Sequence, residues 1–212
     1  MVPYLINTPK WFRWLFPKEM IWDIPNSGEP SVYITFDDGP NPNTTPFVLE
    51  QLDKYGAKAT FFCVGNNITK HPSMYEELLR HGHATGNHTF NHLNGWKTDN
   101  ETYQDNIALA KKYIDSNLFR PPYGMMRSSQ FKTLMKSGPA WKTIMWDVLS
   151  GDFDQKLTGQ QCVKNVLGNI RPGSIVLLHD SEKAWPRMSY ALPLILEYCR
   201  NQNWKMKSIT GY

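Results

Sequence analysis

Two adjacent carboxylates and a pair of histidines four residues apart are the side chains in this sequence best suited to metal chemistry. Asp37 and Asp38 stand in Thr-Phe-Asp-Asp-Gly-Pro, and His88 and His92 bound the segment His-Thr-Phe-Asn-His. Adjacent acids repel each other unless a cation neutralises one of them. One carboxylate and two imidazoles can hold a zinc ion that keeps a position open for water, and a second carboxylate can act as a base on that water. Asp38, His88 and His92 therefore form a candidate metal site.

Each half of this pattern also has a simpler interpretation. Asp-Gly-Pro is common turn chemistry, and two histidines can fall in one surface loop by accident. Gly39-Pro40 breaks the strand, and the turn there can direct both carboxylates into one cleft. His88 and His92 share one face if residues 88–92 make a helical turn, a geometry that metal-binding pairs use.

Arg120 and His179 also follow predicted strands, and Asp147 and Asp152 flank a loop at the end of another. Arg120 precedes two prolines, which donate no backbone hydrogen bond, so Tyr123 offers the first N–H after them. Arginine can hold a carboxylate through two hydrogen bonds, and a histidine at the end of an apolar strand is well placed for acid–base work. A structural ion pair and a core histidine are the alternatives.

Strand-like and helix-like segments alternate from residue 31 onward, with Gly and Pro at many connections. This alternation predicts an α/β fold with a parallel sheet. Near-continuous apolar strands indicate burial on both faces, as in a barrel. The predicted strands are 31–36, 59–64, 83–86, 118–119, 142–148, 174–178 and 204–209, and the predicted helices are 45–54, 72–80, 100–114, 129–136, 158–170 and 189–201. The candidate residues follow strand ends, where barrel active sites lie.

Composition is that of a single domain with an ordinary surface. The chain has 212 residues, of which 41% are hydrophobic, and a net charge of +4 without any run of basic residues. Nucleic-acid binders usually concentrate their positive charge, so we expect no nucleic-acid partner. Cys63, Cys162 and Cys199 have no metal or redox spacing, and so sparse a set favours a reducing compartment.

The first 26 residues are rich in aromatic side chains but interrupted by Pro3, Pro9 and Pro17. The sequence shows neither a stretch typical of a signal peptide nor one long enough to span a bilayer. We expect a cytoplasmic location by default. The favoured interpretation of residues 1–30 is a segment that packs on one end of the barrel, and peripheral membrane contact is the alternative.

Taken together, the motifs across residues 35–180 resemble those of the polysaccharide deacetylases, the fourth carbohydrate esterase family. The resemblance implies a distorted (β/α) barrel with about seven parallel strands in a catalytic domain at residues 31–212. It also implies one divalent metal, for which zinc is the expected ion. The roles that it implies are general base for Asp37, metal ligands for Asp38, His88 and His92, orientation of the base for Arg120, oxyanion binding for the Tyr123 N–H, general acid for His179, and contact with the acetyl methyl group for Leu177.

The fourth motif departs from the family pattern. Asp, two residues and then Asp-Trp are expected there, whereas Leu149 and Phe153 replace the first aspartate and the tryptophan. Asp152 remains the best candidate to orient His179, with Asp147 as the alternative. Phe153 and Trp146 are expected to contact the sugar.

The implied activity is hydrolysis of N-acetyl groups on N-acetylglucosamine-containing poly- or oligosaccharides. Three alternatives stay open on the sequence: a metal-dependent hydrolase of another amide, a non-catalytic carbohydrate-binding relative, and an iron oxygenase, because two histidines and a carboxylate also suit Fe(II). The carbohydrate is the expected partner, and the sequence makes no prediction of oligomeric state.

Overall fold

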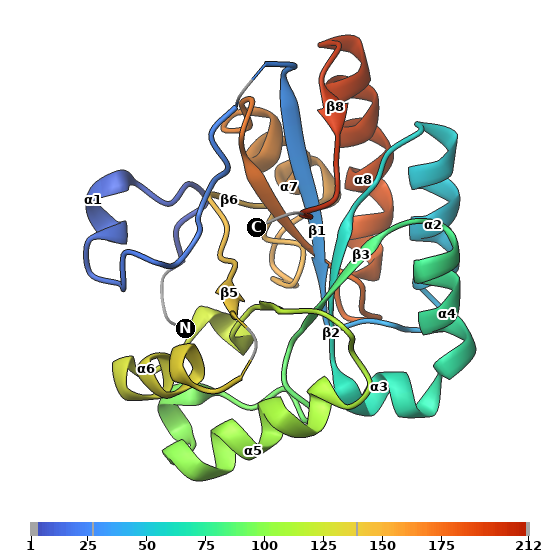
Figure 1. The fold of residues 1–212 in the computed structure, drawn as a ribbon. Helices are drawn as coiled ribbons and strands as arrows, with labels where there is room; N and C mark the ends of the chain where they lie inside the picture. Colours follow the sequence, from blue (N-terminus) through green and yellow to red (C-terminus); the bar gives the residue numbers. More distant parts are fainter. Residues whose placement is uncertain (1–3, 27, 139, 211–212) are drawn as a thin grey trace.

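Seven parallel strands lie side by side in a curled sheet in the computed structural model, which describes residues 4–26, 28–138 and 140–210. Their order is β5-β4-β3-β2-β1-β7-β6, and β8 pairs with the beginning of β1. The predicted barrel of about seven parallel strands is confirmed (Figure 1). The strands are β1 (Ser31–Asp37), β2 (Thr60–Cys63), β3 (Ala84–Asn87), β4 (Leu118–Phe119), β5 (Lys142–Thr143), β6 (Val148–Leu149), β7 (Ile175–His179) and β8 (Lys205–Met206).

Helices follow most strands and cover the sheet, and α2, α4 and α8 lie along one side of it (Figure 1). Alternation along β1 separates the two faces of the sheet. Ile34 and Phe36 join the main hydrophobic core, whereas Thr35 and Asp37 contact Arg120. The helices are α1 (Lys10–Arg13), α2 (Thr45–Lys54), α3 (Gly65–Lys70), α4 (Pro72–Arg80), α5 (Asn100–Lys111), α6 (Ser128–Lys136), α7 (Gly159–Leu167) and α8 (Trp185–Asn201), with 3₁₀ turns η1 (Gly95–Lys97) and η2 (Pro122–Gly124).

The strand predicted at 142–148 is wrong, because this segment forms two strands at opposite ends of the sheet. β5 pairs with β4, and β6 pairs with β7. The residues between them leave the sheet because other groups take their backbone hydrogen bonds. Met145 N–H donates to the carbonyl of Ile21, and the Arg120 guanidinium donates to the carbonyls of Ile144 and Met145.

The segment before β1 contacts both strands at the ends of this row. Ile6 accepts a backbone hydrogen bond from Leu149 in β6, and Ile21 donates one to Thr143 in β5. Residues 4–26 therefore lie across the gap between the two ends, although the domain boundary at residue 30 stays a prediction. No helix of the described ranges is long and apolar enough to span a membrane.

Candidate active site

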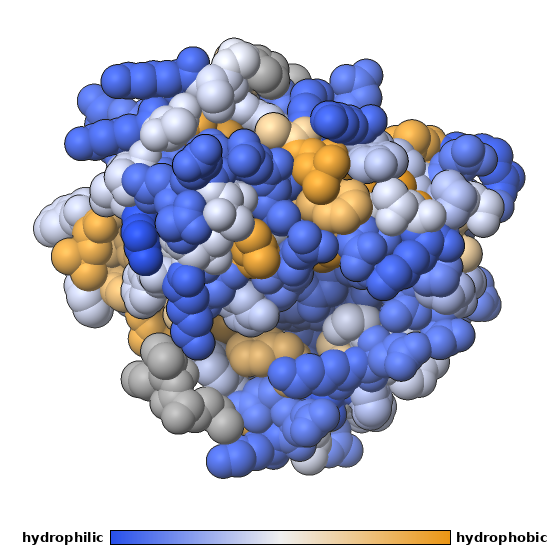
Figure 2. Space-filling model, turned by 90° about the horizontal axis from the view of Figure 1, so that it is seen from below, coloured by the Kyte–Doolittle hydropathy of each residue, from blue (hydrophilic) through white to orange (hydrophobic). Residues whose placement is uncertain are grey.

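The candidate residues gather at the carboxyl ends of the strands. Asp37 and His179 are the last residues of β1 and β7 and are paired in register. His88 directly follows β3, and Arg120 directly follows β4. Figure 2 looks onto this lower end of the molecule, where the surface is hollowed near its centre and the hollow is coloured as hydrophilic.

Unusual backbone conformations turn these side chains into the site. Asp38, Thr89, His92 and Tyr123 have positive φ angles of 79°, 63°, 55° and 61°. Such angles are uncommon for residues other than glycine, and strained residues of this kind cluster at functional sites. Because the Asp38 backbone is in the left-handed region, the chain turns sharply at the end of β1. Carboxylate oxygens of Asp37 and Asp38 both approach His88 Nε2, at 3.7 and 3.9 Å.

Residues 88–92 do not form a helical turn, because side-chain acceptors hold this segment as an irregular loop. The Asn106 carboxamide oxygen accepts from the N–H groups of Phe90 and Asn91, both at 2.8 Å. These contacts replace the backbone hydrogen bonds of a helix. The two imidazole rings nevertheless meet, with centroids 5.0 Å apart.

His88 is held in one tautomer. Its Nδ1 lies 2.7 Å from the carbonyl oxygen of Arg120, which can only accept, so Nδ1 carries the proton and Nε2 is left as a ligand atom. Burial lowers the pKa of His88 to about 4. The ring is therefore neutral at pH 7, as metal binding requires.

The candidate metal ligands fit a divalent cation. One ligand atom from each of Asp38, His88 and His92 can be chosen so that all three lie within 4.8 Å of one another. Asp38 Oδ1 is buried, and none of the described donors makes a well-aligned hydrogen bond to it, although His92 Nε2 lies 3.1 Å away. Burial alone would raise the pKa of Asp38, but the contact with His92 and the nearby histidines lower it below its usual range. A cation would satisfy the unpaired oxygen, since oxygen and imidazole donors suit such ions.

Arg120 orients Asp37 inside the barrel. Its guanidinium lies 2.7 Å from Asp37 Oδ1 and 2.8 Å from the Thr35 hydroxyl, and it stacks 4.0 Å from the Phe62 ring centroid. Arg120 is completely buried and also donates to two backbone carbonyls. The second carboxylate oxygen of Asp37 faces His88 Nε2 at 3.7 Å. The base candidate is therefore fixed beside the metal ligands.

Replacement of Arg120 by Met is expected to destabilise the fold by about 3–5 kcal/mol, because it leaves the Asp37 charge buried without its partner. The free energy of unfolding in urea measures this loss. Arg80→Met is the matched control, because Arg80 pairs with Glu77 on the exposed surface and such pairs contribute at most about 1 kcal/mol. Equal losses in the two variants would contradict the buried pair's importance.

His179 is held by Asp152. The two side chains meet at 2.7 Å through His179 Nδ1, and the second Asp152 oxygen accepts from the His179 backbone N–H at 2.8 Å. Burial alone would lower the pKa of His179, but the charge and hydrogen bond of Asp152 raise it to about 9. Because Nδ1 contacts Asp152, Nε2 is the ring nitrogen that can exchange a proton with a substrate. Asp147 does not take this role, since it hydrogen-bonds Ser174 and the Ile175 N–H at the other end of β7.

The remaining predicted residues lie around these groups. Tyr123 is 59% exposed, with its ring 4.6 Å from that of His92. Phe153 contacts the His179 ring at 5.3 Å between centroids. Leu177 is buried two residues before His179 on the same face of β7. Trp146 is half-buried, with its ring 5.7 Å from the Arg120 guanidinium. Only part of the Trp146 side chain is therefore accessible to a sugar.

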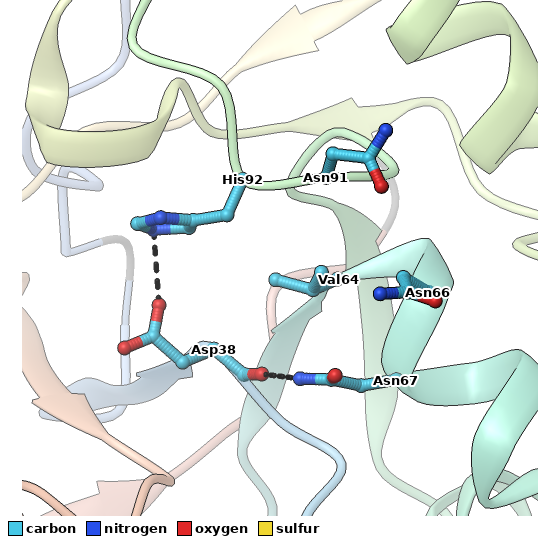
Figure 3. A pocket seen from close by; sticks show the side chains of 6 residues that line it. All are labelled: Asp38, Val64, Asn66, Asn67, Asn91 and His92. Atoms are coloured by element: carbon cyan, nitrogen blue, oxygen red, sulfur yellow. Dashed lines mark hydrogen bonds and ion pairs between the residues drawn. The ribbon is translucent and has the colours of Figure 1, made fainter.

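Three asparagines beside the metal ligands were missed by the sequence reasoning. Asn66, Asn67 and Asn91 line a cleft of about 270 Å³ together with Asp38 and His92 (Figure 3). Two of them belong to α3, a short helix that was not predicted, and the signal for it was a polar Gly-Asn-Asn run directly after an apolar strand. Asn67 donates through its side chain to the Asp38 carbonyl at 2.7 Å.

Replacement of Asn67 by Leu is expected to weaken metal binding by about 10- to 100-fold, the usual cost of losing a group that positions a ligand. The lost hydrogen bond would free the strained Asp38 backbone. Competition with a chromophoric chelator measures the affinity. Asn66→Leu is the control because Asn66 lines the same cleft but makes no described hydrogen bond to Asp38; an equal loss there would point to cleft polarity instead.

Comparison with known proteins identifies the family. A family model described as polysaccharide deacetylase matches residues 25–138, which is more than half of the chain. The chain belongs to the polysaccharide deacetylase family. A peptidoglycan-N-acetylglucosamine deacetylase of Bacillus cereus is 35% identical over 89% of this chain and 90% of that protein. A chitooligosaccharide deacetylase of Azorhizobium caulinodans is 37% identical over 71% and 73% of the two chains.

Solved structures of polysaccharide deacetylases share the fold. The crystal structure of a peptidoglycan N-acetylglucosamine deacetylase in complex with 4-naphthalen-1-yl-N-oxidanyl-benzamide has a TM-score of 0.83 at 28% identity and covers 92% of both chains. A family 4 carbohydrate esterase from Streptomyces lividans in complex with acetate has a TM-score of 0.75 at 25% identity over 85% of this chain and 93% of that one. Metal dependence is a property of the family, and the cluster of Asp38, His88 and His92 is the group able to supply it among the described residues.

The altered fourth motif of this polysaccharide deacetylase still supplies a partner for its histidine. Asp152 is fully buried, and Arg187, a residue that the sequence reasoning did not single out, donates to its backbone carbonyl at 2.6 Å. Leu149, in the place of the usual first aspartate, is buried in β6. Phe153 packs between Tyr4 and His179, with ring centroids 5.1 and 5.3 Å away.

Proposed function

We propose that this chain is a metal-dependent N-deacetylase that hydrolyses N-acetyl groups of N-acetylglucosamine-containing glycans and releases acetate. The observation that carries the proposal is the placement of Asp37 and His179 at the ends of neighbouring strands, beside the cluster of Asp38, His88 and His92. Named relatives that act on peptidoglycan and chitooligosaccharides favour a glycan over another amide. The set of base and acid favours hydrolysis over oxygen chemistry.

The residues of the chain divide the reaction between them. Asp38, His88 and His92 would hold the cation, with zinc as the proposed ion, and when bound it supplies Lewis acidity toward the acetamide carbonyl and toward water. Asp37, oriented by Arg120, accepts a proton from the attacking water. The Tyr123 backbone N–H donates to the carbonyl oxygen as negative charge develops there, an interaction worth on the order of 3 kcal/mol.

His179 completes the reaction at the leaving nitrogen. Nδ1 is bound to Asp152, so Nε2 donates the proton while the carbon–nitrogen bond breaks. One acetamide and one water thereby become an amine and acetate. Leu177 is proposed to contact the acetyl methyl group, and Phe153 and Trp146 the sugar.

Acetate release from N-acetylglucosamine oligomers by metal-stripped protein, with and without added Zn²⁺, tests the proposed function. Zinc-dependent release is the expected result. Absence of release from either these oligomers or peptidoglycan fragments, despite tight zinc binding, would favour a different amide substrate. Consumption of dioxygen after loading with Fe²⁺, without acetate release, would overturn the hydrolase assignment.

Replacement of His92 by Gln is expected to weaken zinc binding by more than about 100-fold, since loss of a direct ligand should exceed the 10- to 100-fold cost of losing a neighbour of the ligands. His92 is half-buried, so the fold should survive the change. Isothermal titration of the stripped protein with Zn²⁺ measures the affinity. His81→Gln is the control, because His81 lies at the C-terminal end of α4 and pairs with Asp53 on the exposed surface. Unaltered affinity in His92→Gln would remove this residue from the site.

A further inference from the structure

An exposed apolar tip projects from the segment that precedes β1. Trp11, Trp14 and Leu15, here called the aromatic tip, are 60%, 84% and 73% exposed. They lie in and directly after α1, which stands apart from the helices that cover the sheet (Figure 1). Exposed large apolar side chains that adjoin one another commonly mark an interaction surface.

The aromatic tip is held firmly by the residues beneath it. The Phe16 ring packs against Phe12 and Trp22 with centroids 5.3 and 5.1 Å away. Arg13 donates to the Thr8 carbonyl and pairs with Asp23 at 3.0 Å. These contacts fix the base of the turn while its apolar side chains face solvent. The exposure is therefore a feature of the folded chain.

The surroundings of the aromatic tip are positively charged. A cavity of about 820 Å³ beside it is lined by four basic residues, namely Lys10, Arg13, Lys18 and Arg171. Asp23 is the one acid among the described residues that line it, and Arg13 and Arg171 both pair with it, at 3.0 and 2.8 Å. The two lysines are exposed, and Glu19 is the one acid in the described residues 4–22.

We propose that the aromatic tip docks this protein on the surface of an anionic phospholipid bilayer. Tryptophan favours the interface between lipid and water, and exposed apolar residues flanked by lysines bind such surfaces through burial and charge together. Trp11, Trp14 and Leu15 enter the interface, and Lys10 and Lys18 face lipid phosphates. A projecting turn suits a flat, deformable lipid surface better than it suits the concave pocket that a protein partner would need to supply.

Sedimentation of the full chain with lipid vesicles tests the proposal. Two vesicle compositions are compared, phosphatidylcholine alone and an equimolar mixture with phosphatidylglycerol. We expect binding to the anionic vesicles that weakens in high salt and falls by about tenfold or more in Trp11→Ser/Trp14→Ser. Trp96→Ser is the matched control, because Trp96 is 54% exposed in η1, outside the tip. Circular dichroism establishes that both variants are folded.

Three results would overturn the docking proposal. One is that the full chain does not bind the anionic vesicles, and another is that the two tryptophan variants lose binding equally. The third is a dimer of the full chain that the tip variant converts to monomer, because a second copy of the chain would then cover the tip. Equal binding to neutral and anionic vesicles would overturn the choice of an anionic lipid. The test involves neither metal nor glycan, so it is independent of the proposed deacetylase activity.

Discussion

Replacement of Asp37 by Asn is expected to lower kcat by about 10²- to 10⁴-fold, the usual contribution of a general base. The amide has the size of the carboxylate, and its oxygen can still accept the hydrogen bond from Arg120 that the structure shows at 2.7 Å. It cannot take the proton of water. Zinc affinity should be retained, since Asp38, His88 and His92 are unchanged.

The measurements that check this are steady-state acetate release and zinc titration on the same preparation. Asp53→Asn is the matched control, because Asp53 also contacts a histidine, His81 at 2.7 Å, on the exposed surface. Loss of zinc together with activity in Asp37→Asn would make Asp37 a ligand. Retention of full activity would remove it as the base.

Replacement of His179 by Asn should also lower kcat for N-deacetylation by about 10²- to 10⁴-fold, but with a dependence on the leaving group. An amine needs a proton in order to leave, whereas a phenolate does not. Hydrolysis of an aryl acetate should therefore be much less affected in the His179 variant and strongly reduced in the Asp37 variant. Equal losses on both substrates would contradict the role of His179 as the acid.

The pH dependence of the reaction follows from the pair of His179 and Asp152. The acid form of His179 is the protonated one, and Asp152 helps to raise the pKa of this histidine to about 9 from a usual 6.5. Activity should therefore fall as the pH rises and His179 loses its proton. Asp152→Asn removes the charge that raises the pKa, so the alkaline limb of kcat should move to lower pH. A limb that does not move in this variant would mean that another group titrates there.

The residues that carry the chemistry of this protein can be identified from short segments of its sequence. Asp37-Asp38, His88 with His92, Arg120 and His179 are recognisable because each lies at or just after the end of a predicted strand. The α2, α4 and β4 bounds agree with their predicted ranges for the same reason, since local punctuation by Pro and Gly marks their ends. The parallel barrel could also be predicted, because alternation of strands and helices leaves few topologies.

Contacts between residues far apart in the sequence determined the parts of the fold that the sequence did not predict. The apolar run at 142–148 reads as one strand, yet Ile21 and Arg120 take its central backbone groups and divide it into β5 and β6. The loop that joins His88 to His92 follows the Asn106 side chain rather than the helical spacing of the histidines. Hydrogen bonds between residues far apart in sequence leave no local periodicity, so no pattern of neighbours could predict them.

The types of residue in the site could be predicted from the sequence, but their arrangement could not, because the arrangement depends on contacts between residues far apart in the chain. Sequence alone determined that two carboxylates, two histidines and a late histidine are available, because residue type and spacing along strands are local properties. The sequence already favours Asp152 over Asp147 as the partner of His179, and the tertiary structure shows that contact. Only the tertiary structure revealed that Asn67 supports the Asp38 backbone. These contacts depend on which strand ends meet when the sheet curls, and that is a property of the whole chain.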